Sequence, residues 1–298
     1  MIEKEEIFQD IDINEGDLKA LKLDGMLVLP NKLKKNTIEE IKKQLKNFNK
    51  ITFNDQIGSI IISENQWIDN LGLCSSTSIQ VILNPSLLEL ADAYFGEKAV
   101  LGSCRYQKKI KTHGPLPPHS DKGPGLVVFI FLNQIDEITG STRFIKGSHL
   151  GGIKDKLTKF KHMDTDYVDP AAFNFEYSSF AVSGGPGTIL IFNQKIIHDL
   201  PKISKTGREI IWATFYPQSK AYLSDDHIFS RNILAQLSES QRSRILFDGV
   251  AKGVPFMKIG GNLSVSDTYN ISNFKRLYYV TSFCIFLIVE KFRALTGI

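Results

Sequence analysis

The chain has 298 residues, of which 42% are hydrophobic and 23% are charged, as expected for a globular protein with a full core. Its formal net charge is only +4 and its basic residues are scattered, so the sequence gives no indication of nucleic-acid binding. Three cysteines without CxxC spacing argue against a disulfide framework and a structural zinc site: Cys74, Cys104 and Cys284. We therefore expect reduced thiols and a cytoplasmic location.

The two ends of the chain differ in character. Residues 1–17 are acidic and lack the apolar stretch of a secretory signal. The apolar segment LYYVTSFCIFLIV, residues 277–289, falls short of the ~20 residues that cross a bilayer. As a helix it would be apolar on nearly every side, so we expect it to pack on its own protein or in a homodimer, ahead of membrane association.

The first predicted elements are a strand over residues 23–30 and a helix in NTIEEIKKQLKNF. Asn36 and Glu39 are spaced like a capping box at the start of this helix. A second helix is predicted in NPSLLELADAYFGE, with Asn84 as its cap and Gly96 as its end.

Short β-like runs separated by Gly, Pro, Asn and Asp fill residues 98–217. This pattern predicts a sandwich or barrel, with helices before and after it. We therefore expect a mainly β fold with flanking helices. The predicted division is a β domain with N-terminal supporting helices over 1–221, and a helical C-terminal extension over 222–298, packed on the barrel or on a partner.

The stretch LPPHSDKGPG, residues 116–125, carries His119 and Asp121 just before the apolar run LVVFIFL. In an extended strand, residues i and i+2 point to the same face, so the imidazole and the carboxylate project together while Ser120 points away. This geometry suits a two-point metal clamp. A third ligand is required to complete a site.

His198 is the candidate for the third ligand, because it lies between the β-like runs GTILIF and REIIWATF. It reaches the same site only if its strand neighbours that of His119. Two histidines and one carboxylate form the facial triad of non-haem Fe(II), which leaves coordination positions for a chelating cosubstrate and dioxygen. Zinc more often has a fourth protein donor, or a water with a separate catalytic acid or base.

Arg208 begins the next β-like run, ten positions after His198. A hairpin return would direct its guanidinium into the same pocket, where a planar fork of donors can hold a carboxylate by two hydrogen bonds. 2-Oxoglutarate needs such a partner for its distal carboxylate while its keto-acid end chelates the iron.

The segments PHSD, GSTRFIKGSH and PGTILIF, followed by His198 and Arg208, occur in the order and approximate spacing of the phytanoyl-CoA dioxygenase-like family of Fe(II)/2-oxoglutarate oxygenases. The chain resembles this family over residues 17–217. The resemblance implies a double-stranded β-helix, a jelly-roll and cupin-like barrel with supporting helices. It also implies a dioxygenase that hydroxylates an unactivated C–H bond of a small organic substrate, releasing succinate and carbon dioxide.

The resemblance also implies roles for individual residues. Family members use polar residues of the strand before the clamp for cosubstrate or substrate, and here Ser103, Arg105 and Gln107 alternate towards one face. Fe(II), 2-oxoglutarate and dioxygen are the implied reactants, with ascorbate as a stimulant. The implied roles are iron ligand for His119, Asp121 and His198, 2-oxoglutarate anchor for Arg208, and cosubstrate or substrate contact for Arg105 and Gln107.

The chain departs from the family pattern two positions after the distal histidine. Many relatives carry a small hydroxyl residue there, whereas this chain has Leu200, and Ser204 or Thr206 are candidates to replace it. His149, in the GSH turn, is interpreted as structural. The remaining histidines lack support as ligands: His113, His162 and His227.

Three alternatives stay open. A halogenase of this fold has Gly or Ala where the carboxylate ligand stands, so Asp121 favours hydroxylation. A metal-dependent hydrolase or isomerase on a cupin-like barrel would explain the three ligands but not Arg208. A non-catalytic metal- or ligand-binding barrel is the third alternative, which succinate formation would exclude.

The segment 151–185 is long for a strand connection, which is typical of a lid at the mouth of a jelly roll. Its lysines favour an anionic small-molecule substrate, such as a phosphorylated, carboxylated or CoA-linked compound, with a solvated charged face as the alternative. These lysines are Lys154, Lys156, Lys159 and Lys161.

Overall fold

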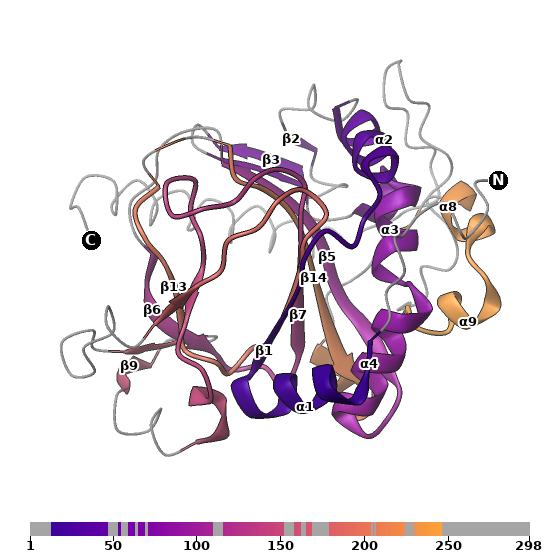
Figure 1. The fold of residues 1–298 in the computed structure, drawn as a ribbon. Helices are drawn as coiled ribbons and strands as arrows, with labels where there is room; N and C mark the ends of the chain where they lie inside the picture. Colours follow the sequence, from indigo (N-terminus) through magenta and orange to yellow (C-terminus); the bar gives the residue numbers. More distant parts are fainter. Residues whose placement is uncertain are drawn as a thin grey trace, which may run out of the picture.

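Two stacked antiparallel sheets and a layer of helices make up the fold (Figure 1). The larger sheet lies in the middle, with the smaller sheet on one side and helices on the other. The structure is a computed structural model. It describes residues 13–46, 53–54, 59–62, 65–68, 71–109, 116–151, 158–161, 165–168, 179–203, 205, 207–223, 229 and 231–245.

The larger sheet owes its position to strands that are apolar on both faces. The run LVVFIF of β7 is buried throughout because one face packs on the helices and the other on the smaller sheet. In spatial order, the eight strands are β1 (Met26–Leu29), β12 (Ile189–Asn193), β7 (Leu126–Phe131), β14 (Glu209–Pro217), β5 (Ala99–Lys109), β4 (Asn65–Ile68), β3 (Ser59–Ile62) and β2 (Phe53–Asn54).

The smaller sheet carries the predicted clamp. Its strands are short and also pair antiparallel, so residues far apart in the sequence meet across them. In spatial order, they are β11 (Phe180–Ala181), β8 (Arg143–Phe144), β13 (His198–Leu200), β6 (Leu116–Asp121), β10 (Thr165–Val168) and β9 (Thr158–Lys161).

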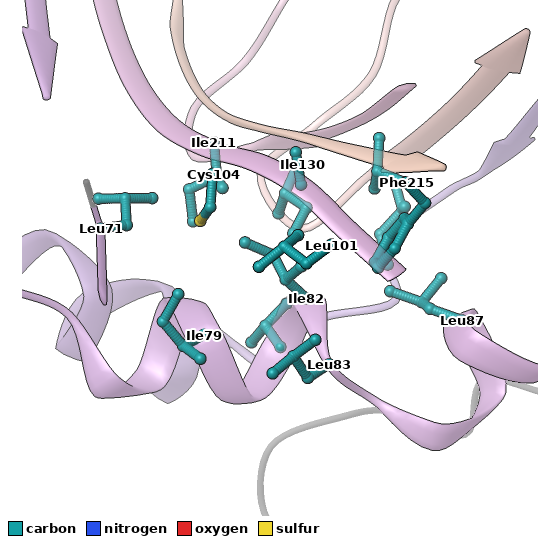
Figure 2. Close-up of a cluster of buried hydrophobic side chains, with 14 of the residues drawn as sticks. Leu71, Ile79, Ile82, Leu83, Leu87, Leu101, Cys104, Ile130, Ile211 and Phe215 are labelled. Atoms are coloured by element: carbon teal, nitrogen blue, oxygen red, sulfur yellow. The ribbon is translucent and has the colours of Figure 1, made fainter. Parts of the chain in front are cut away.

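The main hydrophobic core lies between the larger sheet and the helices. Figure 2 shows Ile79, Ile82 and Leu87 of the helical layer facing Leu101 and Phe215 of the strands. The helices are α1 (Glu15–Asp24), α2 (Lys35–Lys46), α3 (Ser76–Ile82), α4 (Pro85–Phe95), α8 (Arg231–Gln236) and α9 (Glu239–Arg242), with 3₁₀ turns η2 (Leu71–Leu73), η3 (Ser148–Leu150) and η4 (Gln218–Leu223).

A second core fills the space between the two sheets. Phe129 and Phe192 of the larger sheet pack edge to face, and Phe144 of the smaller sheet packs on Phe192 at 4.9 Å between ring centroids. Alternate residues of β7 therefore serve the two cores, as the two-residue period of a strand requires. The mainly β fold with flanking helices is confirmed.

The helix signals predicted around residues 84–97 are confirmed. Asn84 caps α4 through its side chain, Pro85 occupies the first turn, and Gly96 ends the helix in the left-handed conformation at φ 70°. The strand predicted over 23–30 is shorter, because α1 extends to Asp24 and Gly25 ends it at φ 78°.

The predicted cap of the next helix is wrong. α2 begins at Lys35, so Asn36 lies inside the first turn, and the carbonyl of Lys34 accepts the first helical hydrogen bond. The reason is tertiary: the N–H groups of Lys32 and Leu33 both donate to the carbonyl of Gly187, which fixes where the chain enters the helix.

The C-terminal part of the described chain packs on the helical side of the core. Phe229, Ile233, Leu237 and Ile245 are buried in the main cluster. The segment 277–289 lies outside the described residues, and the division at residue 221 stays a prediction. Among the residues that the structure describes, no helix is long and apolar enough to cross a membrane.

Candidate functional site

Strands β6 and β13 bring the three predicted ligands together. His119 and Asp121 lie two apart on β6, and His198, the first residue of β13, pairs directly with His119. One ligand atom from each residue lies within 4.8 Å of the others, and the two imidazole centroids are 4.3 Å apart. The site therefore depends on the pairing of strands that are almost 80 residues apart in the sequence.

The backbone fixes which nitrogen each histidine offers. Nδ1 of His119 is 2.8 Å from the carbonyl of Pro117, and Nδ1 of His198 is 2.9 Å from the carbonyl of Ile196. A carbonyl only accepts, so both Nδ1 atoms carry the hydrogen and donate it. Each Nε2 then presents its lone pair, as a metal ligand requires.

Burial keeps both imidazoles neutral. It lowers the pKa of His119 to about 4, with a further lowering by His198 that Asp121 partly opposes. Burial likewise lowers the pKa of His198 to about 4, and the positive charge of Arg208 acts in the same direction. At neutral pH the three side chains therefore offer two neutral nitrogens and one carboxylate.

Aromatic side chains enclose the distal histidine. The ring of Phe144 stacks on His198 at 5.8 Å between centroids, and Phe192 lies at 5.4 Å. These contacts exclude water from one side of the imidazole and hold its orientation.

Arg208 lies just before β14 and is only 4% exposed. Its Nη1 donates to the carbonyl of Gly140 and, at 3.2 Å, to the hydroxyl of Thr142. Its Nε has no acceptor among the described residues, and the guanidinium carbon lies 5.6 Å from the ring centre of Phe129. Burial lowers the pKa of Arg208 to about 10, so the guanidinium stays charged at neutral pH. A buried cation with only neutral partners here is suited to receive an anion.

Thr142 is the residue that sequence reasoning missed. Its hydroxyl lies 3.2 Å from both terminal nitrogens of Arg208, although the two residues are 66 positions apart. Leu200 is buried and brings no hydroxyl, and the suggested replacements Ser204 and Thr206 lie outside the described residues. Thr142 stands in the quoted GSTRFIKGSH segment, but no spacing rule linked it to Arg208.

The polar positions of β5 face the space between the sheets. Gln107 pairs with Ile210, which belongs to the core between the sheets, and Arg105 pairs with Trp212. Ser103 and Gln107 are buried and Arg105 is half-buried. The three residues therefore share the interior face, as the alternation of the sequence predicted.

The other histidines do not join the metal group in the described part of the chain. Nε2 of His149 lies 3.1 Å from the backbone carbonyl of Lys22 in α1. Since a carbonyl only accepts, Nε2 carries the hydrogen and donates it. His149 thus ties the GSH turn to α1, in keeping with a structural role. His113, His162 and His227 lie outside the described residues.

Of the segment 151–185, the structure describes β9 and β10 and the residues around β11. β10 pairs with β6, with Tyr167 opposite His119, so part of this segment flanks the strand of the clamp. The side chains of the four lysines lie outside the described residues, and the lid stays a prediction.

The sequence matches the family model described as phytanoyl-CoA dioxygenase (PhyH) over residues 21–199. The chain belongs to the phytanoyl-CoA dioxygenase family. The predicted family is therefore confirmed, on a match that includes β6 and the first two residues of β13. No curated protein matches the sequence.

Solved structures of the same fold share little sequence with the chain. EctD from S. alaskensis with bound Fe has 15% identity and a TM-score of 0.56, covering 71% of this chain and 80% of its own. The α-ketoglutarate-dependent epimerase SnoN from nogalamycin biosynthesis has 16% identity and a TM-score of 0.54, covering 68% and 80%. HygX from Streptomyces hygroscopicus, with nickel, 2-oxoglutarate and hygromycin B bound, has 15% identity and a TM-score of 0.51. The match covers 69% of this chain and 88% of HygX. The predicted double-stranded β-helix fold is confirmed by these similarities.

Proposed function

We propose that the protein is an Fe(II)- and 2-oxoglutarate-dependent oxygenase. One observation carries the proposal: a His119, Asp121 and His198 group between the sheets, accompanied by the buried cation Arg208 with no acidic partner among the described residues. Two neutral imidazoles and one carboxylate are the donor set of non-haem Fe(II) oxygenases. A hydrolase or isomerase would use the same three ligands but would leave the buried guanidinium without a function.

The residues of the chain have separate tasks in this proposal. The two imidazoles and Asp121 hold the metal, and Arg208 receives the distal carboxylate of 2-oxoglutarate through its Nε–H. The hydroxyl of Thr142 lies beside the same guanidinium and takes the place of the hydroxyl residue that relatives carry where this chain has Leu200. When bound, Fe(II) and 2-oxoglutarate supply the activation of dioxygen, coupled to oxidative decarboxylation of the cosubstrate.

We further propose hydroxylation of an unactivated C–H bond in a small organic substrate. The aspartate ligand supports this reaction over halogenation, since a halide needs the position that the carboxylate fills. Proteins of this fold include an epimerase and a carbocyclase of nogalamycin biosynthesis, so the fate of the substrate is a separate question from the use of 2-oxoglutarate.

The test is 2-oxoglutarate turnover by the purified protein. With Fe(II), 2-oxoglutarate and oxygen, we expect succinate to form, and to form faster with members of a small-molecule library that are substrates. Mass spectrometry of the product with ¹⁸O₂ distinguishes hydroxylation, which incorporates the label, from epimerisation or ring closure, which does not.

Asp121→Ala is the matched variant for this test. It removes the only anionic residue of the three predicted ligands and should abolish tight Fe(II) binding. Circular dichroism should show that the sheets remain folded. Full substrate-dependent succinate production by this variant would exclude the proposed ligand set, and absence of 2-oxoglutarate binding to the parent protein would exclude the oxygenase.

A further inference from the structure

The turn between β12 and β13 binds the loop that follows Asp121. Gln194 is the first residue of this turn and is 9% exposed. Its backbone carbonyl accepts from the N–H of Asp121 at 2.9 Å, and its backbone N–H donates to the carbonyl of Gly125 at 3.0 Å. Its side-chain oxygen Oε1 accepts from the buried N–H of Gly125, also at 3.0 Å. One glutamine therefore binds both ends of the loop that connects β6 to β7.

The loop, KGPG over residues 122–125, has the glycines that this contact requires. A side chain at Gly123 would place its Cβ 2.0 Å from Oε1 of Gln194, and one at Gly125 would place its Cβ 2.7 Å from the same atom. Both distances are shorter than a van der Waals contact, so glycine is the residue that lets the backbone approach the amide this closely. The loop and the glutamine therefore fit each other.

The contact bears on the proposed metal group because of the residues on either side of it. Asp121 is the last residue of β6, and His198 follows Gln194 by four positions. The imidazoles of His119 and His198 are oriented by their own Nδ1 hydrogen bonds. The place of the carboxylate depends on the backbone of Asp121, which is bound to Gln194 directly and through the loop. We propose that Gln194 is a positioning residue, which sets Asp121 relative to the two imidazoles, and this inference rests on the ligand set of the proposed function.

The side chain of Gln194 carries the part of this role that a substitution can test. Methionine has nearly the same length but no comparable acceptor, so Gln194→Met removes the oxygen to which the buried N–H of Gly125 donates. A buried N–H that loses its acceptor regains one by moving towards water, which displaces the loop and the residue before it. Residues that support metal ligands typically contribute about 10- to 100-fold to metal affinity.

The experiment titrates Ni(II) into the metal-free full chain by calorimetry. Ni(II) binds imidazole more tightly than Fe(II) does, so its affinity stays measurable when the carboxylate is removed. For Gln194→Met we expect a loss of Ni(II) affinity of about tenfold or more. In the Asp121→Ala background the same substitution should change the affinity by less than about twofold, because the glutamine acts through that carboxylate.

Gln44→Met is the matched control. Gln44 lies in the helical layer, where its Oε1 accepts from the hydroxyl of Ser75 at 2.7 Å and from the N–H of Thr77 at 3.3 Å. The variant removes a half-buried amide of the same kind away from the metal group, so it should bind Ni(II) like the parent. Urea denaturation measures the stability that each of the two variants loses, whereas only Gln194→Met should lose metal affinity.

Gly123→Ala tests the same contact without removing a hydrogen-bonding atom. Gly123 does not have a positive φ, and the three atoms nearest to an added Cβ all belong to the amide of Gln194. The methyl group should therefore displace this amide and weaken Ni(II) binding as Gln194→Met does. Gly123→Ala takes the place of Gln194→Met if that variant fails to fold by circular dichroism.

Each other outcome overturns the proposal. Unchanged Ni(II) affinity in the folded variant would show that the glutamine only closes the loop. An equal loss of affinity with and without Asp121 would show that Gln194 acts on a histidine ligand instead. A loss of the same size in Gln44→Met would show that general destabilisation is the cause. The parent titration tests the proposed function separately, because absence of Ni(II) binding to the parent would exclude the metal group itself.

Discussion

Arg208 is the single residue in which burial, charge and position agree most directly with ligand binding. Its guanidinium lies under Phe129, is fixed at one end by Gly140 and Thr142, and leaves Nε without an acceptor in the described part of the chain. A side chain held in place before the ligand arrives loses little conformational entropy on binding. The arginine is therefore held in place for the carboxylate that the proposed function assigns to it.

We predict that Arg208→Met weakens 2-oxoglutarate binding by roughly 10- to 100-fold, since a charge-assisted hydrogen bond contributes about 1.5–3 kcal/mol. Fe(II) affinity should change little, because the side chain of Arg208 makes its hydrogen bonds to Gly140 and Thr142 and not to the three predicted ligands. The 2-oxoglutarate affinity of Arg208→Lys should lie between those of the parent and Arg208→Met, because lysine keeps the charge but lacks the planar fork of donors. Equal 2-oxoglutarate affinity in parent and variants would show that another cation holds the carboxylate.

The buried histidines predict how the metal-free protein responds to acid. His119 and His198 have a pKa of about 4 in the folded protein and about 6.5 when unfolded. Between these pH values the unfolded chain binds more protons than the folded protein. The contribution of the neutral histidines to stability is therefore fully present above about pH 6.5 and is lost as the pH falls towards about 4. At pH 5 the free energy of unfolding should be lower than at pH 7 by about 1–2 kcal/mol for each histidine.

Urea denaturation of the metal-free protein at both pH values measures this loss. The double variant His119→Gln, His198→Gln should lose less stability on acidification than the parent, while the contribution of His149, whose pKa burial also lowers, is retained in both proteins. An equal pH dependence in the two proteins would contradict the assignment to the metal group.

Among the elements, the contact between β8 and β13 determines where His198 stands. Phe144 pairs with His198, and the next pair is Arg143 with Asp199. The guanidinium of Arg143 donates through Nε and Nη2 to both carboxylate oxygens of Asp199, whose side chain is 4% exposed. This ion pair supports the pairing of two very short strands, one of which carries the predicted metal ligand His198.

Removal of one partner of that ion pair should be costly. Arg143→Met leaves the buried carboxylate of Asp199 without its guanidinium, and we expect the free energy of unfolding to fall by about 3–5 kcal/mol. Adding Asp199→Leu should restore part of the loss, because two apolar side chains need no counter-charge. Urea denaturation of the two single variants and the double variant measures the coupling, and additive losses would contradict a direct contribution of the pair.

The local elements differ in how far the sequence determines them. The alternation of β6 predicted that His119 and Asp121 share a face, and strand periodicity is a property of the backbone alone. α1 was not predicted, although Asn14 and Asp17 form a complete capping box at its start, because the helix has little amphipathic pattern. The start of α2 and the contact of Thr142 with Arg208 depend on residues far away in the chain, which no local pattern encodes.

At the scale of the whole molecule, the described residues between 229 and 245 belong to the same hydrophobic core as the larger sheet. Phe229, Ile233, Leu237 and Ile245 are at most 6% exposed in the main cluster. Arg244 adds polar contacts: its backbone carbonyl accepts from Leu101 of β5 at 2.7 Å. Its guanidinium donates to both carboxylate oxygens of Asp92 on α4. The segment therefore closes the helical side of the large sheet.

We predict that a chain ending after Leu223 does not fold stably. Burial of each of the four side chains contributes about 1.5–3 kcal/mol, and their sum is comparable to the whole stability of a domain, about 5–15 kcal/mol. A chain ending after Asn273 is the control, because it keeps all of these contacts and should unfold in urea at a higher midpoint than the chain ending after Leu223. It loses the apolar segment 277–289, so light scattering should show a change of oligomeric state or aggregation. Equal urea midpoints for the two shortened chains would contradict the contribution of the C-terminal residues to the core.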